Sequence, residues 1–163
     1  MFRRALALAV AVMLVVPVLA SARDAGPLRW LDGRVPSAQV QTAGSGALVF
    51  HGRMVVNGTI PERGFVQITD RGGDATAHLG GQELKFNRRH KVSVRRASGI
   101  LFVTGSNVRV RIFGVGLTFA AAGNGRARFL GDGTYRLNSG PTTEWTHAWV
   151  RIAPTPPARR GRR

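Results

Sequence analysis

The chain contains no cysteine in its 163 residues. This absence excludes disulfides, thiolate catalysis, iron–sulfur clusters, cysteine zinc sites and lipid attachment through cysteine. Acidic residues are also scarce: 8 Asp and Glu stand against 24 Lys and Arg, and the net charge is +16. Nearly all of the positive charge is arginine, since Lys85 and Lys91 are the only lysines. A surplus of this size points to a negatively charged partner.

The longest stretch without any acidic residue is 84–131. Like charges that gather without partners destabilise a fold, so a polyanion that relieves the repulsion is the predicted ligand. The alternative is a solvated strand face on a generally basic protein. The predicted polyanion-binding residues are Arg88, Arg89, Lys91, Arg95, Arg96, Arg109, Arg111, Arg126, Arg128 and Arg136.

A short motif inside this stretch supports the same ligand class. Residues 87–92 read NRRHKV, with basic residues at the second, third and fifth positions. This spacing is associated with sulfated or phosphorylated polymers, because neighbouring guanidinium and ammonium groups meet successive anions. The arginines at the end of the C-terminal tail add non-specific attraction at most.

No stretch after the N-terminal apolar run has the period of a helix. Instead, Arg109 and Arg111 alternate with apolar residues, and so do Arg126 and Arg128. This alternation predicts half-buried strands whose arginines share an outer face. We expect the strand of Thr118 to lie between the two arginine pairs, which would place them ~10 Å apart.

Glycine marks the ends of these short strands, as in Asn124-Gly125 and Asp132-Gly133. Links this short predict hairpins and hence an antiparallel meander, because a parallel crossover needs about a dozen residues. The sequence predicts an all-β domain, a single antiparallel β-sandwich or barrel of about 11–12 short strands. A β-solenoid is the alternative, since evenly spaced glycines also mark repeating coils.

The domain boundaries follow from composition. Residues 1–22 combine a basic start, an apolar run and the cleavage signal Ala20-Ser21-Ala22, which is typical of a secretory signal peptide. An uncleaved membrane anchor is the alternative. An extended lead-in segment is expected over 23–46, the all-β domain over 47–152, and a disordered basic tail rich in Pro and Arg over 153–163. The predicted localisation is secreted, extracellular or associated with the cell envelope.

No catalytic constellation is convincing. The four histidines have no metal-ligand spacing, so we predict neither a metal nor a cofactor. The best acid/base pair is Asp132 with Glu144, near Tyr135 and His147. Separately, Trp145 and Trp149 are both at odd-numbered positions of one expected strand, so they should share its inward face and both cover the core.

The pattern from Gly131 to Asn138, followed by Trp145, resembles the ends of small secreted β-proteins, rich in Gly and Arg, from high-GC Gram-positive bacteria. This resemblance implies secretion and a β fold, and no known activity. The function predicted is a non-enzymatic binding or structural module of the cell envelope. A small glycan-active hydrolase and a self-assembling envelope component are the alternatives. The expected partner is an anionic envelope polymer or membrane surface, with nucleic acid bound only non-specifically, and the oligomeric state stays open.

Overall fold

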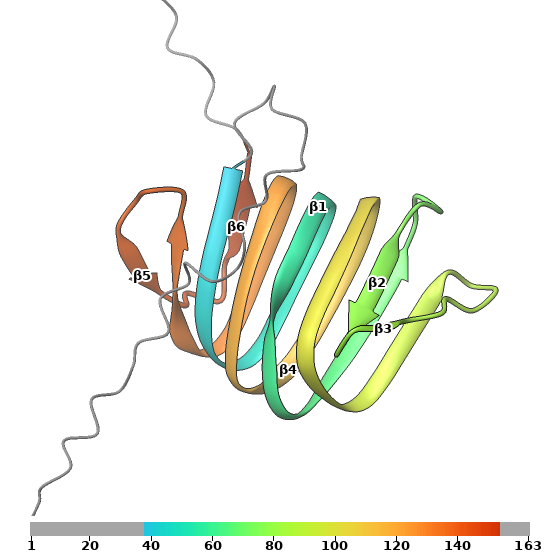
Figure 1. Ribbon diagram of the computed structural model, residues 1–163. Helices are drawn as coiled ribbons and strands as arrows, with labels where there is room; N and C mark the ends of the chain where they lie inside the picture. Colours follow the sequence, from blue (N-terminus) through green and yellow to red (C-terminus); the bar gives the residue numbers. More distant parts are fainter. Residues whose placement is uncertain (1–37, 154–163) are drawn as a thin grey trace, which may run out of the picture.

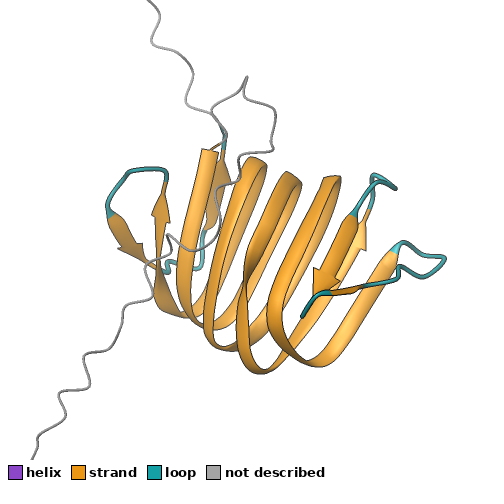
Figure 2. Cartoon of the chain, in the orientation of Figure 1, coloured by secondary structure: helices purple, strands orange, loops and turns teal. Residues whose placement is uncertain are grey.

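The computed structural model describes residues 38–153 and shows an all-β chain (Figures 1 and 2). Six strands are present and no helix occurs in this range. Every pairing between the strands is antiparallel, which confirms the predicted fold class. The strands are β1 (Ala38–Asp70), β2 (Thr76–Leu79), β3 (Gln82–Glu83), β4 (Lys91–Leu137), β5 (Thr142–Glu144) and β6 (Trp149–Ile152).

Two long strands, β1 and β4, make up most of the domain, and both bend back repeatedly to form two layers (Figure 1). The pairing shows how they are interleaved. Ala43 of β1 pairs with both Thr118 and Thr134 of β4, whereas Val49 pairs with Arg111 and Arg128. Each of these segments of one long strand therefore lies between two segments of the other.

The front layer of Figure 1 contains 38–46 and 54–60 of β1, alternating with 99–105, 117–123 and 131–137 of β4. It is extended by β5 at one end and by β2 and β3 at the other. The rear layer contains 47–53 and 64–70 of β1, alternating with 91–97, 108–113 and 124–130 of β4, with β6 at one end.

The core lies between the two layers. Phe50 and Phe129 of the rear layer and Phe119 of the front layer are almost fully buried. The ring centroid of Phe50 is 6.5 Å from that of Phe119 and 6.2 Å from that of Phe129. Apolar side chains at every second position of each segment fill the remaining space, which follows from the period of a strand.

The predicted meander is wrong. Consecutive segments of β4 do not pair with each other, because 108–113 lies in the rear layer, 117–123 in the front layer and 124–130 in the rear layer again. A short glycine link can carry a chain from one layer to the other as well as close a hairpin. The long strands thus wind around the core as coils, as the solenoid alternative expected, but neighbouring coils run antiparallel, as in a sandwich.

Two glycines show why these crossings need their residue type. Gly52 and Gly123 have φ of +143° and +142°, a region that L side chains rarely adopt. A Cβ at Gly52 would lie 2.4 Å from the carbonyl oxygen of Asn124, and one at Gly123 would lie 2.3 Å from that of Arg53. The backbones of β1 and β4 therefore approach closely where they pass between the layers.

The lead-in segment expected over 23–46 is wrong at its C-terminal end, because 38–46 is already a paired part of β1. The small residues of 42–46 suggest a linker in the sequence, but in the structure Gly44 makes room for the indole of Trp145. A Cβ added at Gly44 or Gly133 would come 2.7 Å from that ring. The predicted signal peptide and basic tail lie outside the described residues, apart from position 153.

Trp145 covers one end of the core, as predicted. Its ring stacks on Phe129 with centroids 5.7 Å apart. The indole nitrogen donates to the hydroxyl oxygen of Thr42 at 2.9 Å and to the carbonyl oxygen of Thr134 at 3.1 Å. In the part of the chain that is described, no helix is long and apolar enough to cross a membrane.

Candidate polyanion-binding face

The outer surface of the rear layer carries most of the predicted binding residues, and we call it the cationic face. Directly opposed residues on neighbouring strands point to the same side of a sheet. Their register defines one row across six strand segments, here called the first row. In strand order the first row is Arg151, Arg126, His51, Arg109, Thr69 and Lys91.

A second row runs parallel to the first, two residues further along each strand. Its members are Trp149, Arg128, Val49, Arg111, Gln67 and Ser93. The two arginine pairs therefore share one outer face, as predicted. With one strand of β1 between them, they are ~10 Å apart.

The strand between the arginine pairs differs from the predicted one. It is the segment of β1 with Val49 and His51, whereas Thr118 and Ala120 belong to the front layer. Within the two rows, the charges are thus carried by β4 and β6, and the β1 residues between them are neutral. Like charges directly opposite each other destabilise a sheet, so this interleaving lowers the repulsion within the face.

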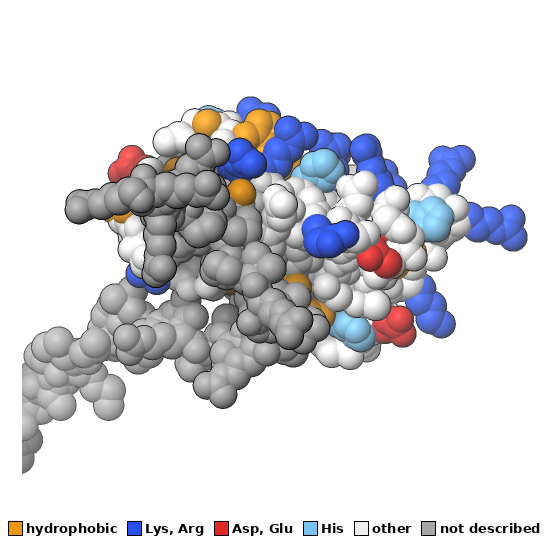
Figure 3. Space-filling view, turned by 90° about the horizontal axis from the view of Figure 1, so that it is seen from above, with side chains coloured by type: hydrophobic (Ala, Val, Ile, Leu, Met, Phe, Trp, Pro, Cys, Tyr) orange, Lys and Arg blue, Asp and Glu red, His pale blue; other side chains and the backbone are white. Residues whose placement is uncertain are grey.

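No carboxylate lies on the cationic face. Among the acids of residues 38–153, only Asp70 belongs to a rear-layer segment; it is buried and accepts hydrogen bonds from the backbone of Gly72, Gly73 and Ala75. Asp74 is bound by Ser106, whose backbone and hydroxyl donors lower the pKa of this carboxyl. Seen from above, Lys and Arg side chains follow one long edge of the molecule (Figure 3).

Arg109 lies in the middle of the first row. Its Nε is buried and has no hydrogen-bond acceptor within the described range. Burial lowers the pKa of its guanidinium, and the neighbouring charges of Arg111, Arg71 and Arg126 lower it further. A buried donor without an acceptor costs free energy, and an anion reaches this atom only when the groups that cover it move.

His51 lies between two arginines of the first row. Burial lowers the pKa of its imidazole below the ordinary 6.5, and the positive charges of Arg126, Arg109 and Arg71 add to the effect. The ring is therefore mainly neutral at pH 7. An anion bound to the neighbouring guanidinium groups would oppose these charges and raise the pKa again.

This shift predicts how stability depends on pH. The unfolded chain binds a proton at His51 near pH 6.5, whereas the folded chain does so only at lower pH. Stability should therefore fall as the pH drops from about 6.5 towards the folded-state pKa. The H51Q variant should lack the part of this pH dependence of stability that comes from His51. Urea unfolding midpoints of both chains between pH 7.5 and 5 measure it, and parallel curves would contradict the prediction.

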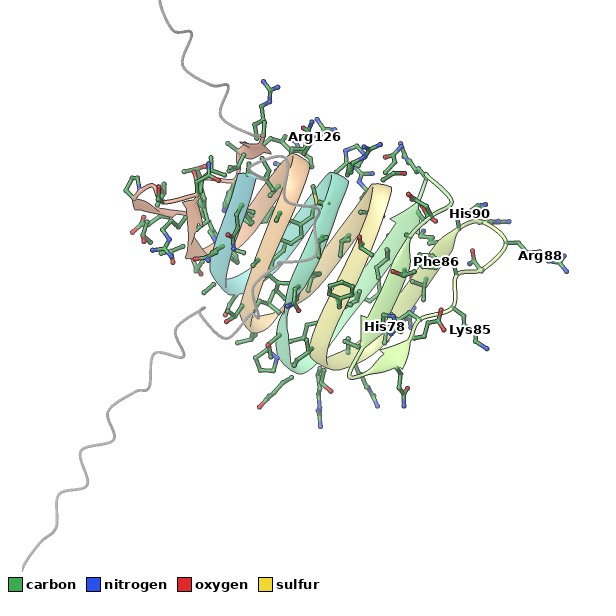
Figure 4. All side chains as sticks on the ribbon, turned by 45° about the horizontal axis from the view of Figure 1, so that its top comes forward. His78, Lys85, Phe86, Arg88, His90 and Arg126 are labelled. Carbon is green, nitrogen blue, oxygen red and sulfur yellow. The ribbon has the colours of Figure 1, made fainter. Side chains whose placement is uncertain are left out.

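A hollow of about 480 Å³ adjoins the first row at the β6 end. Its lining is His51, Gly52, Gly125, Arg126, Trp149 and Arg151. The guanidinium carbon of Arg126 lies 4.4 Å from the centroid of the Trp149 ring, a cation–π contact. Figure 4 places Arg126 at the upper rear edge of the molecule.

The prediction that Trp149 closes the core is wrong, because 40% of its surface is exposed. Residues 145–149 do not form one strand: His147 has a φ of +59° and β6 begins only at Trp149. This break removes the parity that linked the two tryptophans. Within Trp149–Ile152, Trp149 and Arg151 alternate with Val150 and Ile152. This local alternation was the signal that could have placed Trp149 on the outer face, beside the arginines.

The remaining predicted site residues divide by position. Arg95 shares the cationic face, opposite Phe65. Arg88 and Arg89 lie on a turn before β4, where the side-chain oxygen of Asn87 accepts from the backbone N–H of Arg89 at 2.9 Å. Figure 4 shows Arg88 projecting outward from this turn, at the other end of the molecule from Arg126.

Two predicted residues lie away from the cationic face. Arg96 occupies a bend between the layers, with a φ of +55°. Arg136 belongs to the front layer and donates to the side-chain oxygen of Gln41 at 2.7 Å. Sequence reasoning missed Arg151, because its strand lies far from the acid-free stretch in the sequence.

The predicted acid/base pair meets in one hollow. Asp132 and Glu144 both line a depression of about 320 Å³ beside Trp145. Tyr135 is not part of the lining of this hollow, and its ring packs 5.2 Å from Phe129. His147 instead supports the cationic face, because its carbonyl oxygen accepts from Nε of Arg128 at 2.8 Å.

Residues 38–153 contain no group of three or more His, Asp and Glu placed to hold a metal ion. Comparisons with protein-family models, with curated proteins and with solved structures find no match.

Proposed function

We propose that this protein is a secreted, non-enzymatic binding module of the cell envelope that docks an anionic polymer along its cationic face. The observation that carries the proposal is the first row, where Lys and Arg side chains from four strand segments line up and the other two residues, His51 and Thr69, carry no permanent charge. The positive charges of Arg111, Arg71 and Arg126, which lower the pKa of Arg109 within this row, support the same ligand class.

The dimensions favour a polymer over a small anion. Six neighbouring strand segments span ~24 Å across the rear layer. A single phosphate or sulfate group would neutralise one or two guanidinium groups and leave the others repelling each other. A chain of regularly spaced anions relieves the whole face at once, and displaces the small counterions that otherwise gather there.

The extracellular location rests on the predicted signal peptide and on the resemblance to secreted β-proteins. An anionic envelope polymer and an anionic membrane surface both have the charge that the cationic face would attract. A nucleic acid would bind through the same phosphate-type contacts without reading its sequence.

Titration of the purified secreted chain with heparin, followed by intrinsic fluorescence or calorimetry, tests the proposal. We expect the logarithm of the binding constant to fall linearly with the logarithm of the salt concentration, with a slope of roughly −0.7 to −0.9 for each anion contacted. Binding that does not change between low and high salt would contradict the proposal.

A glycan-active hydrolase is the second candidate, favoured by the single hollow that Asp132 and Glu144 share. Its test is the release of reducing ends from cell-wall glycans by the native chain and by the D132N/E144Q variant. Release by the native chain alone would establish the hydrolase, and release by neither chain removes it.

Self-assembly through strand edges is the third candidate, and the structure gives a physical argument against one edge. The segment 91–97 pairs on one side only, with 64–70 of β1. It carries Lys91, Arg95 and Arg96, and a positive φ at Arg96 interrupts its regular geometry. Charges and irregular backbone of this kind protect an edge from pairing with a second copy.

A further inference from the structure

The hollow at the β6 end of the first row combines three kinds of surface. Gly52 and Gly125 contribute backbone without side chains, Trp149 contributes an exposed aromatic ring, and Arg126 and Arg151 contribute cations. Arg126 and Arg151 are directly opposite each other on neighbouring strands. This is the one place on the cationic face where two like charges are adjacent in the same row, so the positive potential is concentrated there.

The glycine floor is imposed by the fold. A Cβ at Gly125 would lie 2.3 Å from the carbonyl oxygen of His51 and 2.4 Å from the terminal carbon of Met54. Gly52 needs its positive φ for the crossing between the layers. Both glycines nevertheless line the hollow beside Trp149, and an aromatic wall with a few polar groups is typical of sites that receive a small ring.

We propose that this hollow binds one sugar unit of an anionic polysaccharide. The ring of the sugar packs on Trp149, and its carboxylate or sulfate accepts hydrogen bonds from Arg126 and Arg151. This inference rests on the proposed function. It adds the class of ligand, an anionic polysaccharide, and names Trp149 as the residue that recognises the sugar ring. The polysaccharide then continues along the first row towards Arg109 and Lys91.

The spacing of the row fits a saccharide with one charge in each disaccharide. Arg126, Arg109 and Lys91 follow one another at every second strand, ~10 Å apart, which is about the length of two sugar rings. An anion two sugar units beyond the hollow therefore lies beside Arg109.

The aromatic side chains distinguish a saccharide from a single-stranded nucleic acid. Proteins that bind single strands offer successive aromatic platforms, one for each of several bases. Trp149 is the only Phe, Tyr or Trp of the first and second rows, and His51 is the only other ring. Phe65 and Phe113 lie two residues beyond the second row and pack on each other, with centroids 6.1 Å apart.

Replacement of Trp149 separates a sugar-binding role from general charge attraction. We would titrate the native chain, W149A and W149Y with three probes: hyaluronan oligosaccharides, inorganic polyphosphate and oligothymidylate. For hyaluronan, which carries one carboxylate per disaccharide, W149A should bind about tenfold more weakly, a loss of ~1.4 kcal/mol. This tenfold loss of affinity should be the same at every salt concentration, because the contact between the sugar and the tryptophan ring does not depend on charge. W149Y should keep most of the affinity.

For polyphosphate, the native chain and W149A should bind within about twofold of each other, with equal salt slopes. The R126Q variant serves as the matched comparison, since it should weaken binding of both polymers and reduce both slopes. Equal losses for hyaluronan and polyphosphate in W149A, or no loss for either, would overturn the saccharide site. A loss confined to oligothymidylate would identify a nucleic acid as the occupant. Absence of binding to every probe would overturn the proposed function itself.

Discussion

A quadruple exchange of arginine for glutamine on the cationic face is expected to weaken heparin binding about a thousandfold near physiological salt. The residues replaced are Arg109, Arg111, Arg126 and Arg128. Each basic residue near an anionic surface contributes about 1 kcal/mol, and ~4 kcal/mol corresponds to about three powers of ten in affinity. The salt slope should also fall by roughly 3, because four fewer anions are neutralised.

A matched control removes the same number of charges elsewhere. It replaces Arg63, Lys85, Arg96 and Arg136, which lie in bends, in a loop or on the front layer. Both variants have the same net charge, so any contribution from the overall charge is equal in the two. We expect the control to lose no more than about tenfold, as long-range attraction is screened over ~10 Å. Equal losses in the two variants would show that the net charge, and no particular face, attracts heparin.

The W145A variant is expected to lose about 3–5 kcal/mol of unfolding free energy. Trp145 is only 8% exposed and stacks on Phe129. Removing the indole leaves a cavity under Gly44 and Gly133, and the hydroxyl of Thr42 loses its donor. Thermal unfolding followed by circular dichroism should show the melting temperature lowered by roughly 10–20 °C.

The W149A variant is the internal control for this prediction, because it removes the same side chain four residues away. Trp149 keeps 40% of its surface exposed, so its loss should cost about 1 kcal/mol or less. The two variants should thus separate stability from sugar binding. Similar melting temperatures for W145A and W149A would show that the core is not closed by Trp145.

The interleaving of β1 and β4 explains how the fold accommodates its charge. The paired neighbours of Arg109 and Arg111 are His51, Thr69, Val49 and Gln67, all from β1 and all without a permanent charge. A meander of β4 alone would have placed the segment of Thr118 between the two arginine pairs, whereas the observed pairing puts Val49 and His51 of β1 there. Winding β4 around β1 places neutral residues of β1 between the two arginine pairs of this face.

Much of the fold and part of the site could be predicted from the sequence. The alternation of Arg109 and Arg111 with apolar residues is a local pattern, and it correctly placed both arginines outside an all-β core. The same holds for Arg126 and Arg128. The absence of acids from 84–131 likewise agrees with the absence of carboxylates from the β4 segments of the cationic face.

Other features depend on contacts between residues far apart in the sequence. Arg151 and Trp149 come next to Arg126 only because β6 pairs with 125–128 of β4. Gly44 and Gly46 look like linker residues in the sequence. In the structure they are required because a Cβ at Gly44 would collide with Trp145 and Gly133, and one at Gly46 with Leu130. No local signal carries such information.

The sequence by itself determined the strand character, the face of each strand that points outward and the concentration of positive charge, since these follow from residue type and a period of two. Only the tertiary structure decided which strands are neighbours, that His51 separates the arginines, and that Trp149 joins them outside the core. The physical reason is that a short glycine link permits either a hairpin or a crossing between layers. The choice between them is made by the packing of the whole core.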